Sequence, residues 1–115
     1  MSQDRSAIPP GTLDMLILKT LARGGELHGF EIAEAIQAVS EEILQVEEGS
    51  LYPALQRMLV KDWIAGDWRK TEGNRRARYY RLTPAGRKHL RREMERYYAV
   101  SRAIGLILAQ PGEVS

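Results

Sequence analysis

The stretch from Glu47 to Leu59 constrains the fold most, because it has the pattern of a helix with two different faces. Its apolar residues recur at helical spacing and form one stripe, which consists of Leu51, Leu55, Met58 and Leu59. The opposite face holds side chains that hydrogen-bond or stack, and they are Ser50, Tyr52, Pro53, Gln56 and Arg57. Ser50 is expected in the first turn, where its hydroxyl can accept from a free backbone N–H. Pro53 then has to lie near that first turn, where a missing N–H costs little, and the helix starts between Glu47 and Ser50. Such a helix suits a DNA major groove, although an ordinary amphipathic core helix fits the same residues taken alone.

Two more helices are predicted before this stretch. The first covers about residues 12–23 and is ended by Gly24–Gly25, and the second covers about residues 29–39. Leu18 lies off the main apolar face of the first helix, so we expect that helix to be buried on more than one side. A brief strand is expected within residues 43–46. Three helices in this order form a helix-turn-helix layout, with the third helix in the recognition position.

The spacing of apolar residues changes directly after the third helix. Trp63–Lys70 and Arg78–Leu82 predict two strands, and Gly73–Asn74 between them predicts a hairpin turn. A hairpin that directly follows a recognition helix is called a wing. Its cations, opposed only by Glu72, are Arg69, Lys70, Arg75, Arg76, Arg78 and Arg81. A charged edge that prevents strand aggregation needs only a couple of charges, so this excess favours contacts with phosphates or a narrow minor groove.

The net charge of +2 conceals a strong asymmetry along the chain. Residues 1–68 hold 5 of the 17 basic and 11 of the 15 acidic residues, which makes this part net −6. Residues 69–115 hold the other 12 basic and 4 acidic residues and are net +8. Such segregation creates a local field, and polyanions are the natural partners of the second part.

Composition argues against several other classes. The 115 residues fit one domain, no apolar run is long enough to cross a bilayer, and no secretory signal is present. We therefore expect a cytoplasmic protein. Without cysteine, with only His28 and His89, and without a Gly-rich phosphate loop, we expect no enzyme, cofactor or metal site. His28 is expected to be a cap or a packed ring. Trp63 and Trp68 are either core residues or ligand-stacking platforms, and we expect core residues.

Thr83–Pro84 is typical of a helix start, and this last helix runs to about Ala109, before Pro111–Gly112. Its apolar series alternates steps of four and three, the spacing of a coiled-coil seam. The residues of this series are Leu90, Met94, Tyr97, Ser101, Ile104 and Leu108. We expect them to form the interface of a homodimer. Packing of the helix on the first helix of its own domain is an alternative that is compatible with dimerisation.

Four motifs give the chain a family resemblance. They are Gly11–Leu18 (GTLDMLIL), Leu27–Ile32 (LHGFEI), Glu48–Leu55 (EGSLYPAL) and Arg75–Gly86 (RRARYYRLTPAG). In this order and spacing they resemble the PadR family of bacterial transcriptional regulators over about residues 11–95. The resemblance implies a homodimeric winged helix-turn-helix repressor. It also implies DNA contacts from Ser50, Tyr52, Pro53, Arg75, Arg76 and Arg78. Family members with a longer C-terminal region dimerise through it, and binding of aromatic effectors or drugs between subunits is associated with them.

The expected fold is mainly α with a small β-hairpin (α+β). We expect a flexible arm (1–10), a winged helix-turn-helix domain (11–83), a long C-terminal dimerisation helix (84–110) and a tail (111–115). The predicted function is sequence-specific binding of a palindromic operator by a repressor, with release by a small aromatic effector as a further expectation. The predicted DNA-binding residues are Ser50, Tyr52, Pro53, Gln56, Arg57, Arg69, Lys70, Arg75, Arg76 and Arg78. The alternative is a winged-helix module that binds an acidic protein partner.

Overall fold

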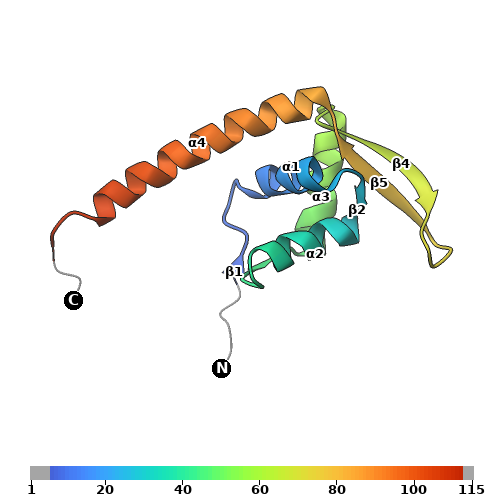
Figure 1. The fold of residues 1–115 in the computed structure, drawn as a ribbon, viewed down its shortest axis with the longest axis horizontal. Helices are drawn as coiled ribbons and strands as arrows, with labels where there is room; N and C mark the ends of the chain where they lie inside the picture. Colours follow the sequence, from blue (N-terminus) through green and yellow to red (C-terminus); the bar gives the residue numbers. More distant parts are fainter. Residues whose placement is uncertain (1–5, 113–115) are drawn as a thin grey trace.

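The computed structural model describes residues 6–112 of the 115-residue chain. Residues 1–5 of the predicted arm and residues 113–115 of the predicted tail lie outside this range. In that range the fold is α+β, as predicted, with three helices grouped beside the first half of a long fourth helix and a projecting hairpin (Figure 1). The helices are α1 (Leu13–Gly24), α2 (Gly29–Val39), α3 (Glu48–Val60) and α4 (Pro84–Leu108). The strands are β1 (Ser6–Ala7), β2 (Leu27–His28), β3 (Leu44–Gln45), β4 (Ile64–Lys70) and β5 (Arg76–Leu82).

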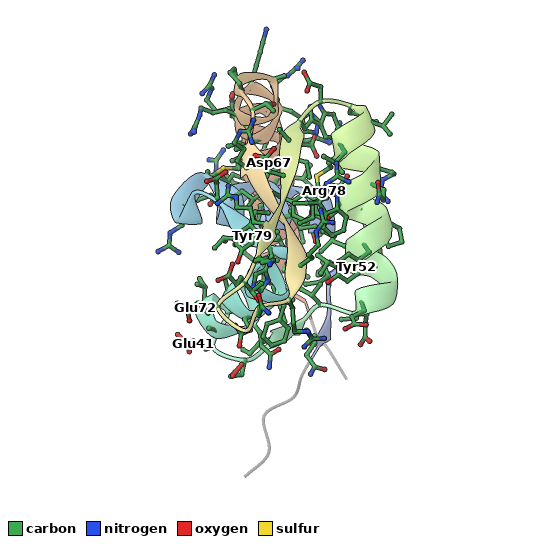
Figure 2. The ribbon with its side chains drawn as sticks, turned by 90° about the vertical axis from the view of Figure 1, so that its right-hand side faces the viewer. Glu41, Tyr52, Asp67, Glu72, Arg78 and Tyr79 are labelled. Carbon is green, nitrogen blue, oxygen red and sulfur yellow. The ribbon has the colours of Figure 1, made fainter. Side chains whose placement is uncertain are left out.

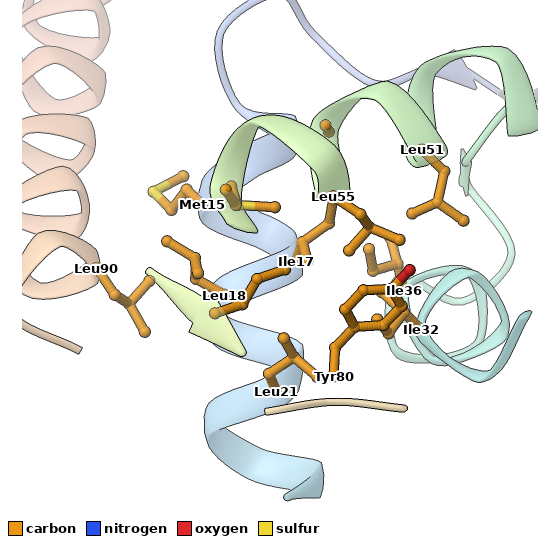
Figure 3. Close-up of a cluster of buried hydrophobic side chains, with 13 residues drawn as sticks. Met15, Ile17, Leu18, Leu21, Ile32, Ile36, Leu51, Leu55, Tyr80 and Leu90 are labelled. Atoms are coloured by element: carbon orange, nitrogen blue, oxygen red, sulfur yellow. The ribbon is translucent and has the colours of Figure 1, made fainter. Parts of the chain in front are cut away.

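One apolar core joins α1, α2 and α3 to the hairpin and to the start of α4 (Figure 3). Its largest fully buried side chains are Ile17, Leu18, Leu21, Ile32, Leu51, Leu55, Met58 and Ile64. Because Ile17 and Leu18 are adjacent in α1 and both fully buried, the prediction that this helix is covered on more than one side is confirmed. Tyr80 of β5 and Leu90 of α4 complete the core.

The predicted hairpin consists of β4 and β5, within an antiparallel sheet of order β2–β5–β4. Its register runs from Ile64 opposite Leu82 to Lys70 opposite Arg76. The second strand therefore starts two residues earlier than predicted, because Arg76 and Ala77 continue the backbone pairing. Asn74 turns the chain with a φ of 62°, a left-handed conformation that asparagine tolerates better than most residues.

The segment before α1 is more ordered than predicted. β1 pairs in parallel with β3, which confirms the expected brief strand, and the Ser6 N–H donates to the Ile43 carbonyl at 2.7 Å. The expectation of a flexible arm is therefore wrong for Ser6–Ala7. Thr12 occupies the N-cap position of α1, but its hydroxyl donates to the Pro9 carbonyl (2.8 Å) and makes no cap hydrogen bond.

α4 begins as predicted, since the Thr83 hydroxyl accepts from the Gly86 N–H (2.9 Å) and Pro84 is the first helical residue. Leu90 is only 4% exposed, and Met94 is partly buried against the same core. Packing of α4 within its own domain is thus confirmed for its first half, and Leu90 belongs to this core instead of the predicted dimer seam.

Residues 95–112 are all exposed, and the second half of α4 extends beyond the domain (Figure 1). None of the helices within residues 6–112 combines the length and the hydrophobicity of a membrane span.

Candidate nucleic-acid interface

α3 has the polar face that its sequence predicts. The exposed residues of this face are Ser50, Tyr52, Pro53, Gln56 and Arg57, whereas the buried ones opposite are Leu51, Ala54, Leu55 and Met58. The helix starts at Glu48, within the predicted range, and Pro53 lies one turn further in than predicted. No side chain caps the start of α3, so the hydroxyl of Ser50 is not used as a cap there.

The ring of Tyr52 is held against the first residue of α2. A Cβ built on Gly29 would lie 2.9 Å from both Cε1 and the hydroxyl oxygen of Tyr52, so only glycine allows this approach. Tyr52 nevertheless remains 45% exposed. The contact with Gly29 therefore limits the freedom of a side chain that is still partly on the surface.

The side chains of the hairpin alternate between its two faces along each strand, and cross-strand partners lie on the same face. From the register, the first face holds Gly66, Trp68, Lys70, Arg76, Arg78 and Tyr80. The second face holds Ala65, Asp67, Arg69, Ala77, Tyr79 and Arg81. Figure 2 shows the two faces: Arg78 lies on the side of α3 and Tyr52, and Tyr79 lies on the other side.

The cations of the second face are neutralised within the chain. Arg81 pairs with Asp67 at 2.8 Å, and Arg69 pairs with Glu26, which lies between α1 and β2. The hydrogen bond to Glu26 raises the pKa of Arg69 further above its ordinary value, and the carboxylates of Glu26 and Asp67 add to this effect. The Arg69 guanidinium also lies 5.0 Å from the centre of the Tyr79 ring. This face is consequently a poor place for phosphate contacts.

The first face keeps its positive charge. Among the described residues, Lys70, Arg75, Arg76 and Arg78 form no ion pair with an acidic side chain. Arg75, Arg76 and Arg78 line a groove of about 570 Å³ between the hairpin and α3, together with Tyr52 and Gln56. The structure thus brings part of each predicted set to one groove, namely Tyr52 and Gln56 of α3 and Arg75, Arg76 and Arg78 of the wing.

This arrangement can be compared with known proteins. A sequence model described as the transcriptional regulator PadR-like family matches residues 17–92. The chain belongs to the PadR-like family of transcriptional regulators. Family membership makes it a DNA-binding regulator with a winged-helix fold, and members of the family are generally not enzymes.

Solved structures of similar proteins agree with this assignment. A PadR family transcription regulator from Clostridium difficile is 30% identical, with a TM-score of 0.72, and the match covers 86% of this chain and 100% of that one. A transcriptional regulator from Clostridium thermocellum is 28% identical, with a TM-score of 0.75, over 83% and 91% of the two chains.

A relative found by sequence is an uncharacterised 37.1 kDa protein in transposon TN4556 of Streptomyces fradiae. It is 41% identical over 103 residues, which are 88% of this chain and 27% of that protein.

Two of the predicted DNA-binding cations of this PadR-like protein are already engaged. Arg57 of α3 pairs with Asp14 of α1 at 2.7 Å, and Arg69 pairs with Glu26 as described above. Each arginine therefore links its element to the α1 region. Sequence spacing could not reveal this, because each acid lies 43 residues from its arginine.

Trp68 and Phe30 are surface residues that the sequence did not single out for this site. Trp68 is 58% exposed and Phe30 is 64% exposed, and both line the groove. The expectation that Trp68 is a core residue is wrong, because its position in the register places it on the first face, beyond the end of the core. Trp63 is partly buried against the core, as expected, and stacks on His89 with ring centres 3.6 Å apart.

The prediction that His28 is a cap or a packed ring is confirmed. His28 is the N-cap of α2, where its Nδ1 accepts from the Glu31 N–H (3.3 Å) and the Glu31 carboxylate accepts from the His28 N–H (3.1 Å). This reciprocal pair is a capping box. It fixes the start of α2, against which Tyr52 rests.

Proposed function

We propose that this PadR-like protein is a homodimeric repressor that binds a palindromic operator in the cytoplasm. α3 enters the major groove, and the first face of the hairpin lies along the flanking backbone. The observation that supports this best is the shared groove, in which unpaired wing cations and the polar face of α3 meet. Occupancy of the operator then excludes RNA polymerase from the promoter.

The two sets of residues have different roles in this proposal. Gln56 and Ser50 read base edges, because side-chain amides and hydroxyls match the donors and acceptors of the major groove. Tyr52 and Pro53 fit the surface of α3 to the DNA. Lys70, Arg75, Arg76 and Arg78 neutralise phosphates, which supports affinity for any sequence. Arg57 and Arg69 stay in their ion pairs and do not contact phosphates.

Dimerisation through the second half of α4 completes the proposal. Its exposed large apolar residues are Tyr97, Tyr98, Val100, Ile104, Leu106, Ile107 and Leu108. Together with Ser101, and with Met94, which is partly buried against the core of its own protomer, they include the rest of the predicted seam. A twofold dimer would place two α3 helices in successive major grooves, about 34 Å apart. Sedimentation of an Ile104→Asp/Leu108→Asp variant should show a monomer where the wild type sediments as a dimer.

A cavity supports the expected release by a small aromatic effector. It measures about 330 Å³ and lies between α1, the preceding segment and α4, and its apolar walls include Met15, Leu16, Met94, Tyr97 and Tyr98. An aromatic ring in this cavity would contact both the winged-helix domain and the dimerisation helix. Filling it with Met94→Trp should abolish any release of operator DNA that a panel of small aromatic compounds produces on the wild type.

The main test measures DNA affinity against salt concentration. The logarithm of the association constant should fall with the logarithm of salt, by about 0.9 for each phosphate neutralised on duplex DNA. Replacing Arg75 and Arg76 by alanine should weaken binding to all sequences and flatten this slope. A matched Arg69→Ala/Arg81→Ala variant removes the same charge from the neutralised face, and its slope should remain close to that of the wild type.

Two outcomes would contradict the proposal. If the Arg75/Arg76 and Arg69/Arg81 double variants flatten the slope equally, the face of the wing on which a cation lies does not affect binding. If the wild type does not bind random duplex DNA at low salt, the protein-interaction alternative with an acidic partner is favoured. Replacing Gln56 should instead reduce the preference for operator over random DNA, with little change in slope.

A further inference from the structure

Trp68 is an unusual surface residue, because the core does not need it and yet it is held in a defined place. It is 58% exposed in the middle of β4. The other tryptophan, Trp63, is partly buried at the start of the same hairpin. A large exposed indole on the first face of the wing therefore calls for a role outside the core.

The neighbours of this indole are guanidinium groups. Arg78 is its direct cross-strand partner and Arg76 is its diagonal partner, so all three side chains share one face. The guanidinium carbons of Arg76 and Arg78 lie 5.4 Å and 6.0 Å from the centre of the indole ring. At such distances the negative face of the ring attracts a cation. Trp68 thus contacts two of the four unpaired wing cations.

Gly66 makes room for one of these arginines. A Cβ at Gly66 would lie 2.7 Å from Nε and 3.3 Å from Cγ of Arg78, so the side chain of Arg78 lies directly over the backbone of β4. The Nε atom is buried there and has no hydrogen-bond partner among the described residues. The position of Arg78 is therefore set by Gly66 on one side and by Trp68 on the other, and not by an acidic side chain.

We infer that Trp68 is a positioning residue for DNA binding, and this inference rests on the proposed function. Its indole holds the guanidiniums of Arg76 and Arg78 side by side, although their like charges repel each other. An acid could hold them too, but it would cancel the charge that phosphates need. An aromatic ring orders the arginines and leaves their charge intact. The two arginines then lose less conformational freedom when they contact the DNA backbone.

The test compares Trp68→Tyr with Trp68→Leu in the full chain. Tyrosine keeps an aromatic face, whereas leucine keeps apolar bulk without one. We expect Trp68→Leu to lower affinity for random duplex DNA about tenfold and Trp68→Tyr to lower it by less than about threefold, since cation–π pairs act in both subunits. The salt slope should fall for Trp68→Leu and stay near the wild-type value for Trp68→Tyr. The melting temperatures of both variants should match the wild type, because the side chain is exposed.

The outcomes separate this inference from the proposed function. If the wild type binds duplex DNA and Trp68→Leu binds equally well with the same slope, Trp68 does not position the arginines and the repressor proposal stands. If both variants lose affinity equally, only bulk matters and the inference fails. If the wild type binds no DNA, the proposed function itself is overturned.

Fluorescence gives a second readout that does not depend on affinity. In a Trp63→Phe background, Trp68 is the sole tryptophan of the chain. Addition of duplex DNA should reduce the quenching of its emission by acrylamide, because the indole becomes covered together with the arginines. Quenching that is unchanged at saturating DNA would place Trp68 outside the interface and contradict the inference.

Discussion

The carbonyl oxygen of Trp63 lies directly against Gly86, where a Cβ would come within 1.9 Å of it. The same oxygen accepts a hydrogen bond from the Thr83 N–H at 3.1 Å. Trp63 follows α3 at the base of the wing, and Gly86 lies in the first turn of α4. This backbone contact therefore joins the DNA-binding unit to the proposed dimerisation helix, and it depends on the absence of a side chain.

Gly86→Ala should destabilise the protein, because a backbone carbonyl cannot move aside as a flexible side chain can. Overpacking of this kind typically costs about 1–3 kcal/mol, and we expect a value near the upper end. Denaturant unfolding measures it. Gly105→Ala is the matched control in the same helix, since nothing lies within 4 Å of its Cβ position. That change should raise stability by up to about 1 kcal/mol, and an equal loss in both variants would argue against the steric explanation.

Gly66→Ala should weaken DNA binding while it leaves the fold largely intact. The new Cβ would displace Arg78, whose side chain is flexible enough to give way at little cost in stability. We expect a loss in affinity of a few-fold, because one wing cation per subunit leaves its place beside Trp68. A mobility-shift titration and a thermal melt on the same sample measure both quantities. Unchanged affinity would show that the placement of Arg78 has no role in binding.

Asp14→Asn should increase affinity for duplex DNA, because it releases Arg57 from its ion pair on the exposed face of α3. The pair is solvent-exposed, so its loss should lower stability by no more than about 1 kcal/mol. Asp67→Asn removes the same charge from the second face of the wing and controls for net charge. The gain should be larger for Asp14→Asn, and it should disappear in an Asp14→Asn/Arg57→Gln variant. Equal gains would indicate a long-range charge effect alone.

Tyr80→Phe should remove part of the alkaline instability of the protein. Burial raises the pKa of Tyr80 above its ordinary value, and the nearby Arg78 opposes this shift while Tyr52 adds to it. The folded state therefore retains a proton that the unfolded state releases. The corresponding stability is complete below about pH 10 and is lost as the pH rises through the folded-state pKa. Denaturant unfolding from pH 8 to 11 should show a shallower decline for Tyr80→Phe, and parallel curves would contradict the shift.

Local pattern was sufficient to predict most of the elements. The helical spacing of Leu51, Leu55 and Met58 predicted which side of α3 is buried, and Thr83–Pro84 predicted where α4 begins. These signals are local because caps, turns and amphipathic faces depend on residues a few positions apart. The parallel pairing of Ser6–Ala7 with Leu44–Gln45 has no such signal, since two-residue strands carry almost no periodicity.

The sequence by itself determined the order of the elements, the polar face of α3, the concentration of cations on the wing and the family to which the chain belongs. Only the tertiary structure decided which of the predicted DNA-binding cations, on α3 and on the wing, remain unpaired. Arg57 and Arg69 meet acids 43 positions away, whereas Arg76 and Arg78 meet the indole of Trp68. A sequence pattern shows which residues are close along the chain. Neutralisation of a charge depends on which residues are close in space, and this is set by how α1, the sheet and α3 pack on one core.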